Sequence, residues 1–423
     1  MESDDESSHS KLTSDVIEVH AMKLEDIQAI ESKHLIQTYA RQPVLFVRGN
    51  GSKLYDDRGR QYTDFLSGIG VNVLGYNHPL IRRVFQEQND LLHVSNLFYN
   101  AYQGPLAARL AEVSGFDRAF FCNSGTEANE AAFKLARALN FKRGNKTKTK
   151  IVAFENSFHG RTFGSLSATG TKKYREPFEP LVPGFIFARQ ELEEINSKID
   201  DETAAVIVEP IQGEGGINPF PADLLQALRK RCDETGALLI FDEVQCGLGR
   251  TGKVFVFQHY NVKPDVLTLA KPLGLGVPLG VVLVRDEVAT GLAAGEHGTT
   301  FGGGPLACRL SLDFLSMLID GDLLAQVQSV GDYFKSKLEL IRSNNPEIIK
   351  DVRGQGLMLG IELSFPGKPL VGAMLERSFV INCTHEVVLR FLPPYIISRE
   401  EIDSMLRELE GALQHEYNTR QTD

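Results

Sequence analysis

Short apolar runs alternate with longer amphipathic stretches through the middle of the chain. Between about residues 76 and 300 the apolar runs are RAFFCNS, IVAFEN, AAVIVEP, ALLIFDEV and DVLTLAK, and segments with apolar residues at helical spacing separate them. Strands that alternate with helices are typical of a mainly parallel sheet. We therefore predict a large α/β domain over residues 76–311.

The flanking segments follow other patterns. Residues 24–40 carry apolar residues near helical spacing, and residues 52–66 predict a hairpin with Asp57 and Gly59 at its turn. We assign residues 25–75 to an N-terminal segment that packs with a small domain. That domain, residues 312–423, is predicted to be α+β because long amphipathic stretches precede and follow the runs LMLGIEL and VVLRFLPP.

Length, charge and cysteine usage narrow the class of protein. A chain of 423 residues exceeds the size at which one core keeps growing, which favours at least two domains. The net charge of −10 argues against nucleic acid as the main partner. Five scattered cysteines without a CxxC pair favour a reducing compartment and argue against a zinc site or a disulfide scaffold.

The first residues, MESDDESSHSKLTSD, are acidic and polar, unlike a signal or transit peptide. We predict a disordered acidic tail over residues 1–24. No apolar run reaches the roughly 20 residues that a membrane helix needs. These features together predict a cytoplasmic protein without a membrane partner.

Three apolar runs end in a charged residue: Glu209, Asp242 and Lys271. Any one of them could simply face water, but ligands of open α/β sheets bind at the carboxyl ends of the strands. A buried lysine loses its proton easily, and a neutral amine can form a Schiff base with an aldehyde. Lysine with an acid therefore suggests pyridoxal phosphate, whose aldehyde needs the lysine and whose ring nitrogen needs the acid. No metal is expected.

A candidate phosphate cradle lies upstream. The strand Arg118–Cys122 leads into Ser124, Gly125 and Thr126, and a strong helix follows. Hydroxyls and free amides at a helix N-terminus, with a glycine for close approach, form an anion site. An ordinary serine or threonine helix cap explains the same residues, and local evidence does not separate the two.

A rival motif, GLGRTGK at residues 247–253, fits GxGxxG and suggests a nucleotide-binding dehydrogenase. The segment also nearly fits the phosphate-loop pattern GxxxxGK(S/T). However, Val254 occupies the position where that pattern needs serine or threonine. No clear helix follows, and no acidic residue lies about 20 positions further on. We therefore favour a glycine-rich loop beside the active site.

Six segments in this order resemble the class III aminotransferases: NSGTEANEAAFKLAR, ENSFHGRTFGSLSATG, VEPIQGEGG, IFDEVQCGLGRTGK, LTLAKPLGLGVPLG and GTTFGGGPLAC. The resemblance runs from about residue 30 to about residue 412. It implies pyridoxal-phosphate chemistry on fold type I, with a mainly parallel seven-stranded sheet and a smaller α+β domain. It also implies a homodimer with shared active sites.

Within the family, the chain most resembles members that transfer the terminal amino group of N2-acetyl-L-ornithine to 2-oxoglutarate. That reaction gives N-acetyl-L-glutamate 5-semialdehyde and L-glutamate, in arginine biosynthesis. The segments that carry this closer resemblance include HVSNLFYN and INCTHEVVLRFLPP. Related members act on succinylornithine, ornithine, 4-aminobutyrate or an acylated lysine precursor, and these substrates remain alternatives.

The resemblance implies two catalytic residues. Lys271 would hold the cofactor and, once freed, carry a proton between substrate and cofactor carbons, while Asp242 would pair with the ring nitrogen. Phe158 and Val244 would pack on the ring faces, and Gln245 would bond the ring hydroxyl. The cofactor-binding residues implied are Ser124, Gly125, Thr126, Phe158, Asp242, Glu243, Val244, Gln245, Lys271 and Thr300, the last serving the partner subunit.

Substrate residues follow from the same resemblance. Arg161 would bind the α-carboxylate of acetylornithine, with Thr299 nearby. Arg390 would bind 2-oxoglutarate, with Glu214 masking it in the first half-reaction; the alternative for Arg390 is a structural ion pair. His159 is more easily explained as structural than catalytic, and Glu209 receives no step.

Two residues depart from the family pattern, Pro272 after the lysine and Gly304 where asparagine is expected. Neither removes a catalytic group, although both could alter rate or substrate fit. A non-catalytic binding or scaffold protein on the same fold is the alternative from a different class. The intact set of Lys271, Asp242, Arg161 and Thr300 argues against it.

Overall fold

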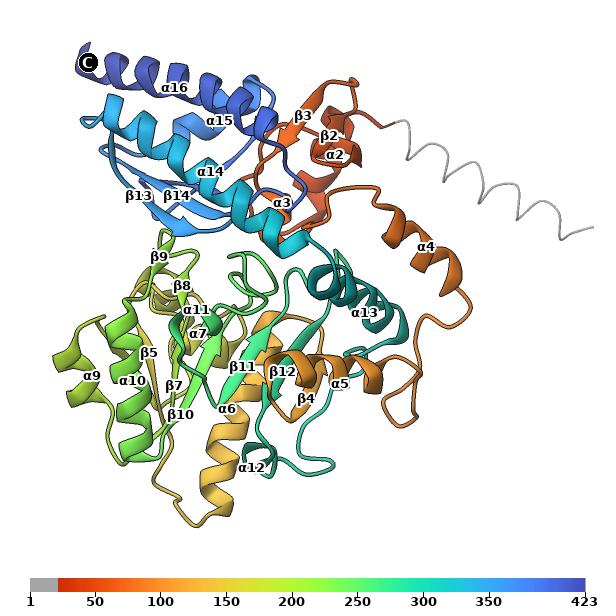
Figure 1. Ribbon diagram of the computed structural model, residues 1–423, viewed down its shortest axis with the longest axis vertical. Helices are drawn as coiled ribbons and strands as arrows, with labels where there is room; N and C mark the ends of the chain where they lie inside the picture. Colours follow the sequence, from red (N-terminus) through yellow and green to blue (C-terminus); the bar gives the residue numbers. More distant parts are fainter. Residues whose placement is uncertain (1–21, 423) are drawn as a thin grey trace, which may run out of the picture.

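The computed structural model describes residues 22–422. Most of the predicted acidic tail, residues 1–21, lies outside these residues. In Figure 1 a large domain that contains the main sheet lies below a smaller domain, and the N-terminal segment packs beside the smaller one. None of the helices in the described part of the chain is both long and apolar enough to span a membrane.

A seven-stranded sheet forms the centre of the large domain and confirms the predicted mainly parallel arrangement. Only β12 runs antiparallel to its neighbours. In spatial order the strands are β4 (Arg118–Cys122), β12 (Gly280–Val284), β11 (Val266–Leu269), β10 (Leu238–Asp242), β7 (Thr203–Val208), β5 (Lys150–Phe154) and β6 (Phe185–Ala188).

Helices cover both faces of this sheet, which explains why its strands are largely apolar. Ile240 of β10 packs on the side of α6 (Gly125–Lys142). Leu239 and Phe241 point to the opposite side, where α5 (Gln103–Ser114), α10 (Ala222–Thr235) and α13 (Pro305–Asp320) complete the main core. Residues buried on both faces leave only the strand ends for polar chemistry.

The small domain contains an antiparallel sheet in the order β13 (Ile349–Gln355), β14 (Met358–Leu363), β17 (Val388–Phe391) and β16 (Asn382–Thr384). Its helices are α14 (Leu323–Asn344), α15 (Lys368–Glu376) and α16 (Arg399–Thr422). The boundary predicted at residue 312 falls inside α13, so the exact domain division remains a prediction.

The N-terminal segment forms a second four-stranded sheet, β1 (Phe46–Asn50), β2 (Lys53–Asp56), β3 (Gln61–Asp64) and β15 (Phe379–Val380). Strands β2 and β3 are the predicted hairpin. Because β15 follows α15 in the chain, its parallel pairing with β3 joins this segment to the small domain. The helical spacing noted over residues 24–40 corresponds to a shorter helix, α2 (Leu24–His34), which buries no residue.

Shorter elements connect these layers. They are α3 (Ser67–Gly70), α4 (Pro79–Glu87), α7 (Phe163–Ala168), α8 (Lys172–Arg175), the 3-10 turn Glu176–Phe178, α9 (Leu192–Lys198), β8 (Ile211–Gln212), β9 (Asn218–Pro219), α11 (Phe257–Tyr260) and α12 (Asp286–Ala289).

Candidate active site

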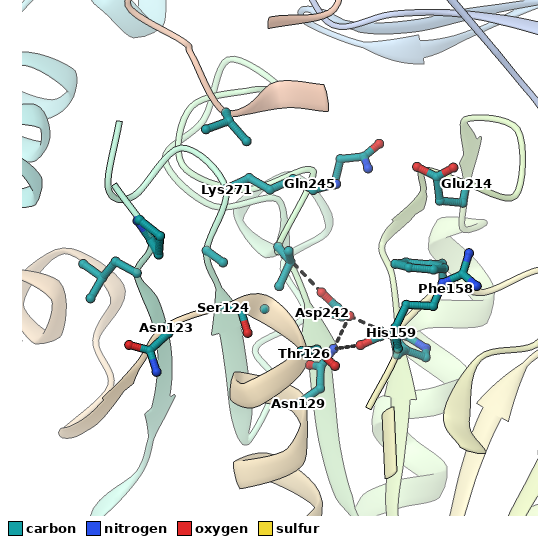
Figure 2. A pocket seen from close by; sticks show the side chains of 18 of the residues that line it. Asn123, Ser124, Thr126, Asn129, Phe158, His159, Glu214, Asp242, Gln245 and Lys271 are labelled. Atoms are coloured by element: carbon teal, nitrogen blue, oxygen red, sulfur yellow. Dashed lines mark hydrogen bonds and ion pairs between the residues drawn. The ribbon is translucent and has the colours of Figure 1, made fainter. Parts of the chain in front are cut away.

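A cavity of about 450 Å³ opens at the carboxyl ends of the central strands, and all three predicted strand-end charges line it. Glu209 follows β7 directly, Asp242 ends β10, and Lys271 lies two residues beyond β11. Figure 2 shows Asp242 at the base of this cavity and Lys271 above it. The structure thus gathers residues that are distant in sequence into one site.

Lys271 has the properties of a nucleophilic amine. Burial lowers its pKa from 10.5 to about 8, although the negative charge of Glu214 acts to raise it. About one tenth of the amine is therefore neutral at pH 7 and about half at pH 8. This matches the predicted need for an amine that can attack an aldehyde.

Asp242 is a buried carboxylate with three hydrogen-bond donors. The backbone N–H of Val244 donates to Oδ1 at 3.1 Å. His159 Nδ1 and Asn129 Nδ2 each donate to Oδ2 at 2.8 Å. Three donors stabilise the negative charge that a protonated ring nitrogen would need beside it.

The residues of the predicted phosphate cradle act as a helix cap and also line the cavity, so both explanations offered for them apply. Ser124 caps α6 by accepting a hydrogen bond from the Glu127 N–H at 3.3 Å, and it also lines the cavity with Gly125 and Thr126. The N–H groups of Gly125 and Thr126, the first two residues of α6, have no intrahelical acceptor and are available to an anion. A Cβ at Gly125 would lie 2.6 Å from Val244 Cγ1, so glycine is required there.

Phe158 and Val244 supply apolar surface to the cavity, and Glu209 fixes the loop that carries Phe158. Its carboxyl accepts the N–H of Phe158 at 2.7 Å and that of Gly213 at 3.0 Å. Burial raises the pKa of Glu209 to about 7. Glu209 thereby connects two loops of the site, the second being the one that leads to Glu214.

Glu243 does not reach the cavity. Its carboxyl accepts the N–H groups of Val256 and Phe257 at 2.7 and 2.9 Å, and burial raises its pKa to about 8. Its side chain therefore supports the start of α11 and lies away from the cofactor position implied by the resemblance.

The two predicted arginines occupy different settings. Arg161 lines the cavity, and its guanidinium lies 4.1 Å from the centre of the Tyr174 ring. Arg390, on β17, is buried and donates from Nη1 to Glu214 Oε1 at 2.5 Å and to Gln245 Oε1 at 3.3 Å. Burial acts to raise the pKa of Glu214, but the charge and the hydrogen bond of Arg390, together with the charge of Lys271, lower it overall.

Thr299 and Thr300 are not brought into the cavity of their own chain. Thr299 Oγ1 accepts a hydrogen bond from Asn123 Nδ2 at 3.0 Å, in a separate recess of about 180 Å³. Thr300 is exposed. Their predicted service to a partner subunit therefore remains a prediction.

The GLGRTGK loop connects the domains and does not resemble a nucleotide cradle. Arg250 is fully buried and donates to the carbonyls of Leu357 and Pro393 in the small domain at 3.1 and 2.6 Å. The helix after the loop, α11, spans only four residues. The dehydrogenase alternative thus gains no support from the structure.

The two departures from the family pattern lie at turns. Pro272 begins the turn after Lys271, where the carbonyl of Ala270 accepts the Leu273 N–H at 2.6 Å. Gly304 is the residue before α13 and supplies no side-chain cap, a bond that an asparagine could make. Neither position lines the cavity.

The lining fits pyridoxal phosphate in each of its parts. Helix N–H groups suit a phosphate, a partly neutral lysine suits an aldehyde, and a fixed carboxylate suits a cationic ring nitrogen. Sequence reasoning missed Asn129, which also lines the cavity. Its signal was a polar residue on the mostly apolar buried face of α6, which also contains Asn140.

Comparison with known proteins agrees with this chemistry. A family model for class-III aminotransferases matches residues 36–413. The acetylornithine aminotransferase of Methanocaldococcus jannaschii is 49% identical, covering 90% of this chain and 96% of its own. That of Aquifex aeolicus is 50% identical, covering 89% and 99%.

Among solved structures, an ornithine aminotransferase from Toxoplasma gondii superposes with a TM-score of 0.91 at 32% identity. The match covers 97% of this chain and 99% of that one, and that structure holds pyridoxal phosphate at partial occupancy in its active site.

Proposed function

The chain belongs to the class III aminotransferases, which are pyridoxal-phosphate enzymes, and on this premise we propose the reaction that it catalyses. It transfers the terminal amino group of N2-acetyl-L-ornithine to 2-oxoglutarate, giving N-acetyl-L-glutamate 5-semialdehyde and L-glutamate. The observation that carries this proposal is the 49–50% identity to two acetylornithine aminotransferases over nearly their whole length.

The site residues support the cofactor half of this proposal. When bound, the cofactor supplies an aldehyde that takes the amino group and a ring that accepts electrons. Lys271 Nζ would hold the aldehyde carbon and, when released, would move a proton between substrate and cofactor carbons. Asp242 balances the positive charge at the ring nitrogen, and Phe158 and Val244 hold the ring between them. Gln245 bonds the ring hydroxyl, and the amides of Gly125 and Thr126 with Ser124 hold the phosphate.

The two arginines divide the substrate carboxylates. Arg161 binds the α-carboxylate of acetylornithine, because it lines the cavity beside Phe158. Arg390 binds a carboxylate of 2-oxoglutarate. Its bond to Glu214 supports a masking role for Glu214 while the amine substrate occupies the site.

We further propose a homodimer in which Thr299 and Thr300 serve the neighbouring site. Four apolar side chains on the surface support this assembly, because exposed apolar patches mark interfaces. Their exposed fractions are 87% for Leu97, 67% for Phe98, 104% for Tyr99 and 66% for Phe301. A stable, fully active monomer in sedimentation would contradict it.

A cytoplasmic location completes the proposal. All five cysteines are free thiols in the described residues, as a reducing compartment favours.

An absorption spectrum of the purified holoenzyme tests the substrate. N2-acetylornithine should bleach the band of the bound cofactor fastest, and 2-oxoglutarate should restore it. Faster bleaching by ornithine, succinylornithine, 4-aminobutyrate or an acylated lysine precursor would keep the chemistry and change the substrate. Ornithine is the first competitor, since the T. gondii relative is an ornithine aminotransferase. Absence of any band after adding cofactor would favour a non-catalytic role.

A further inference from the structure

We propose that Asn129 on α6 is a positioning residue that fixes the orientation of the Asp242 carboxylate, and that Thr268 on β11 fixes Asn129 in turn. This inference rests on the proposed pairing of Asp242 with the cofactor ring nitrogen. It concerns how the carboxylate is held, which is independent of the amine substrate.

Both N–H groups of the Asn129 amide donate a hydrogen bond, and its oxygen accepts one. Nδ2 donates to the His159 carbonyl at 2.7 Å and to Asp242 Oδ2 at 2.8 Å. Oδ1 accepts from Thr268 Oγ1 at 2.8 Å. Asn129 and Thr268 are 1% and 0% exposed, so water does not compete for these bonds. Figure 2 shows Asn129 below Asp242, with His159 beside them.

Chemistry allows only one orientation of this amide. The Asp242 carboxylate and the His159 carbonyl can only accept hydrogen bonds, so the NH₂ group must face them. A flipped amide would place its oxygen against two acceptors and leave a buried clash of like dipoles. This orientation places Asn129 Oδ1 next to Thr268, so the Thr268 hydroxyl must donate its hydrogen bond to Oδ1.

The result is a carboxylate with one oxygen fully occupied. Oδ2 of Asp242 receives Asn129 Nδ2 and His159 Nδ1, whereas Oδ1 receives only the Val244 N–H. An oxygen of a carboxylate takes about two donors, so the remaining capacity is on Oδ1. A ring N–H that bonds Asp242 therefore has to approach Oδ1, and Asn129 prevents the carboxylate from rotating away.

His159 cannot replace Asn129 in this role. Its Nε2 is buried without a partner in the described residues, so a tautomer that keeps the proton on Nδ1 is the one that satisfies Asp242. The two donors also come from different elements, since His159 lies in the loop after β5 and Asn129 in α6. Loss of the helix donor would leave Oδ2 of Asp242 held by the loop donor alone.

Asn129→Asp is the most direct test, because it keeps the shape of the side chain and reverses its chemistry. A second carboxylate would then face Asp242, and it could donate only when protonated. The apoprotein variant should bind pyridoxal phosphate roughly 10–100-fold more weakly than wild type at pH 8. This ratio should shrink as pH falls and residue 129 takes up a proton. The titratable groups that face Asp242 are His159, Glu209, Glu243, Cys246 and Lys271.

Because those neighbours titrate in both proteins, the quantity to follow is the ratio of dissociation constants between variant and wild type. Asn140→Asp is the matched control, about three turns further along the same helix. Asn140 is also buried, but its amide donates only to the Ala136 carbonyl. The control should alter thermal stability without a pH-dependent change in cofactor affinity.

A cofactor analogue with CH in place of the ring nitrogen separates positioning from packing. Asn129→Asp should bind this analogue as well as wild type does, because no ring N–H then needs Asp242. Equal weakening for cofactor and analogue would show a packing defect and overturn the proposal, as would unchanged cofactor affinity in the variant.

Thr268 supplies a second test if Asn129→Asp does not fold. Thr268→Val should weaken cofactor binding roughly 3–10-fold, since the amide loses the bond that fixes it, and Thr268→Ser should restore it. Equal affinities in the valine and serine variants would contradict the chain of bonds. None of these measurements uses an amine substrate, so failure of the acetylornithine assignment would leave their outcome unchanged.

Discussion

The base and the mouth of the cavity are held in opposite ways. At the base, Asp242 receives all three donors from the large domain. At the mouth, Arg390 comes from β17 of the small domain and bonds Glu214 and Gln245 of the large domain. A relative movement of the domains leaves bonds within one domain unchanged, whereas bonds between domains are lost when the domains move apart. The cofactor end is therefore fixed and the carboxylate end exchangeable.

Substitution of Lys271 at the base should have the largest effect. Lys271→Ala removes the amine that we propose holds the cofactor and moves the proton, so turnover should fall by roughly 10²–10⁴-fold or more. Steady-state transamination with N2-acetylornithine measures this. Lys230→Ala, an exposed lysine on α10, is the control, and near-normal turnover in the Lys271 variant would refute its role.

At the mouth, Arg390→Lys should affect one half-reaction. A lysine cannot offer the planar pair of donors that a carboxylate prefers, so KM for 2-oxoglutarate should rise roughly 10–100-fold. Cofactor affinity should stay at the wild-type value, which is the sharpest contrast with a change at the base. If the cofactor dissociation constant rises as well, the separation between the two ends is not real.

Cofactor capture should depend on pH through Lys271. Its pKa is lowered to about 8, and only the neutral, deprotonated amine attacks the aldehyde. The rate of cofactor capture should therefore rise with pH and level off above about pH 8. Between pH 7 and pH 9 the neutral fraction increases about tenfold. Stopped-flow mixing of apoprotein with cofactor measures the profile, and a flat profile over this range would contradict the assignment.

Glu214→Gln should change activity least of these substitutions. It affects both Arg390 at the mouth of the cavity and Lys271 at its base. Without its charge, Arg390 is open to carboxylates in both half-reactions, so bleaching by glutamate relative to N2-acetylornithine should increase roughly 3–10-fold. The same change removes a charge that raises the Lys271 pKa, so the capture profile should shift to lower pH. Unchanged discrimination between the two amines would argue that Arg390 is a structural ion pair.

Local patterns predicted the parts of the site that local structure creates. Glu209, Asp242 and Lys271 each end an apolar run, and the ends of neighbouring parallel strands meet at one edge. Ser124, Gly125 and Thr126 stand between a strand and a strong helix. Each of these signals lies within a few residues of the group that it predicts.

The remaining features depend on contacts that no short pattern contains. Thr268, Asn129 and Asp242 form one chain of bonds although they lie on three different elements. In the sequence Arg250 belongs to a glycine-rich motif that suggests nucleotide binding. In the structure its guanidinium donates hydrogen bonds to backbone carbonyls of the small domain. Glu243 was implied to bind the cofactor but does not line the cavity. Neighbouring residues of an extended chain point to opposite sides, and Asp242 already faces the cavity.

The antiparallel strand β12 also determines when the cofactor site can fold during synthesis of the chain. Strand β4, which leads into the phosphate cradle, is at the sheet edge and pairs only with β12. Its partner residues are about 160 positions away along the chain, so closing this pair costs more entropy than any neighbouring hairpin. During synthesis the cradle strand must wait until the segment after Lys271 has emerged. The proposed anion site and Lys271 are therefore completed together, and we expect a nascent chain to bind the cofactor only after both are present.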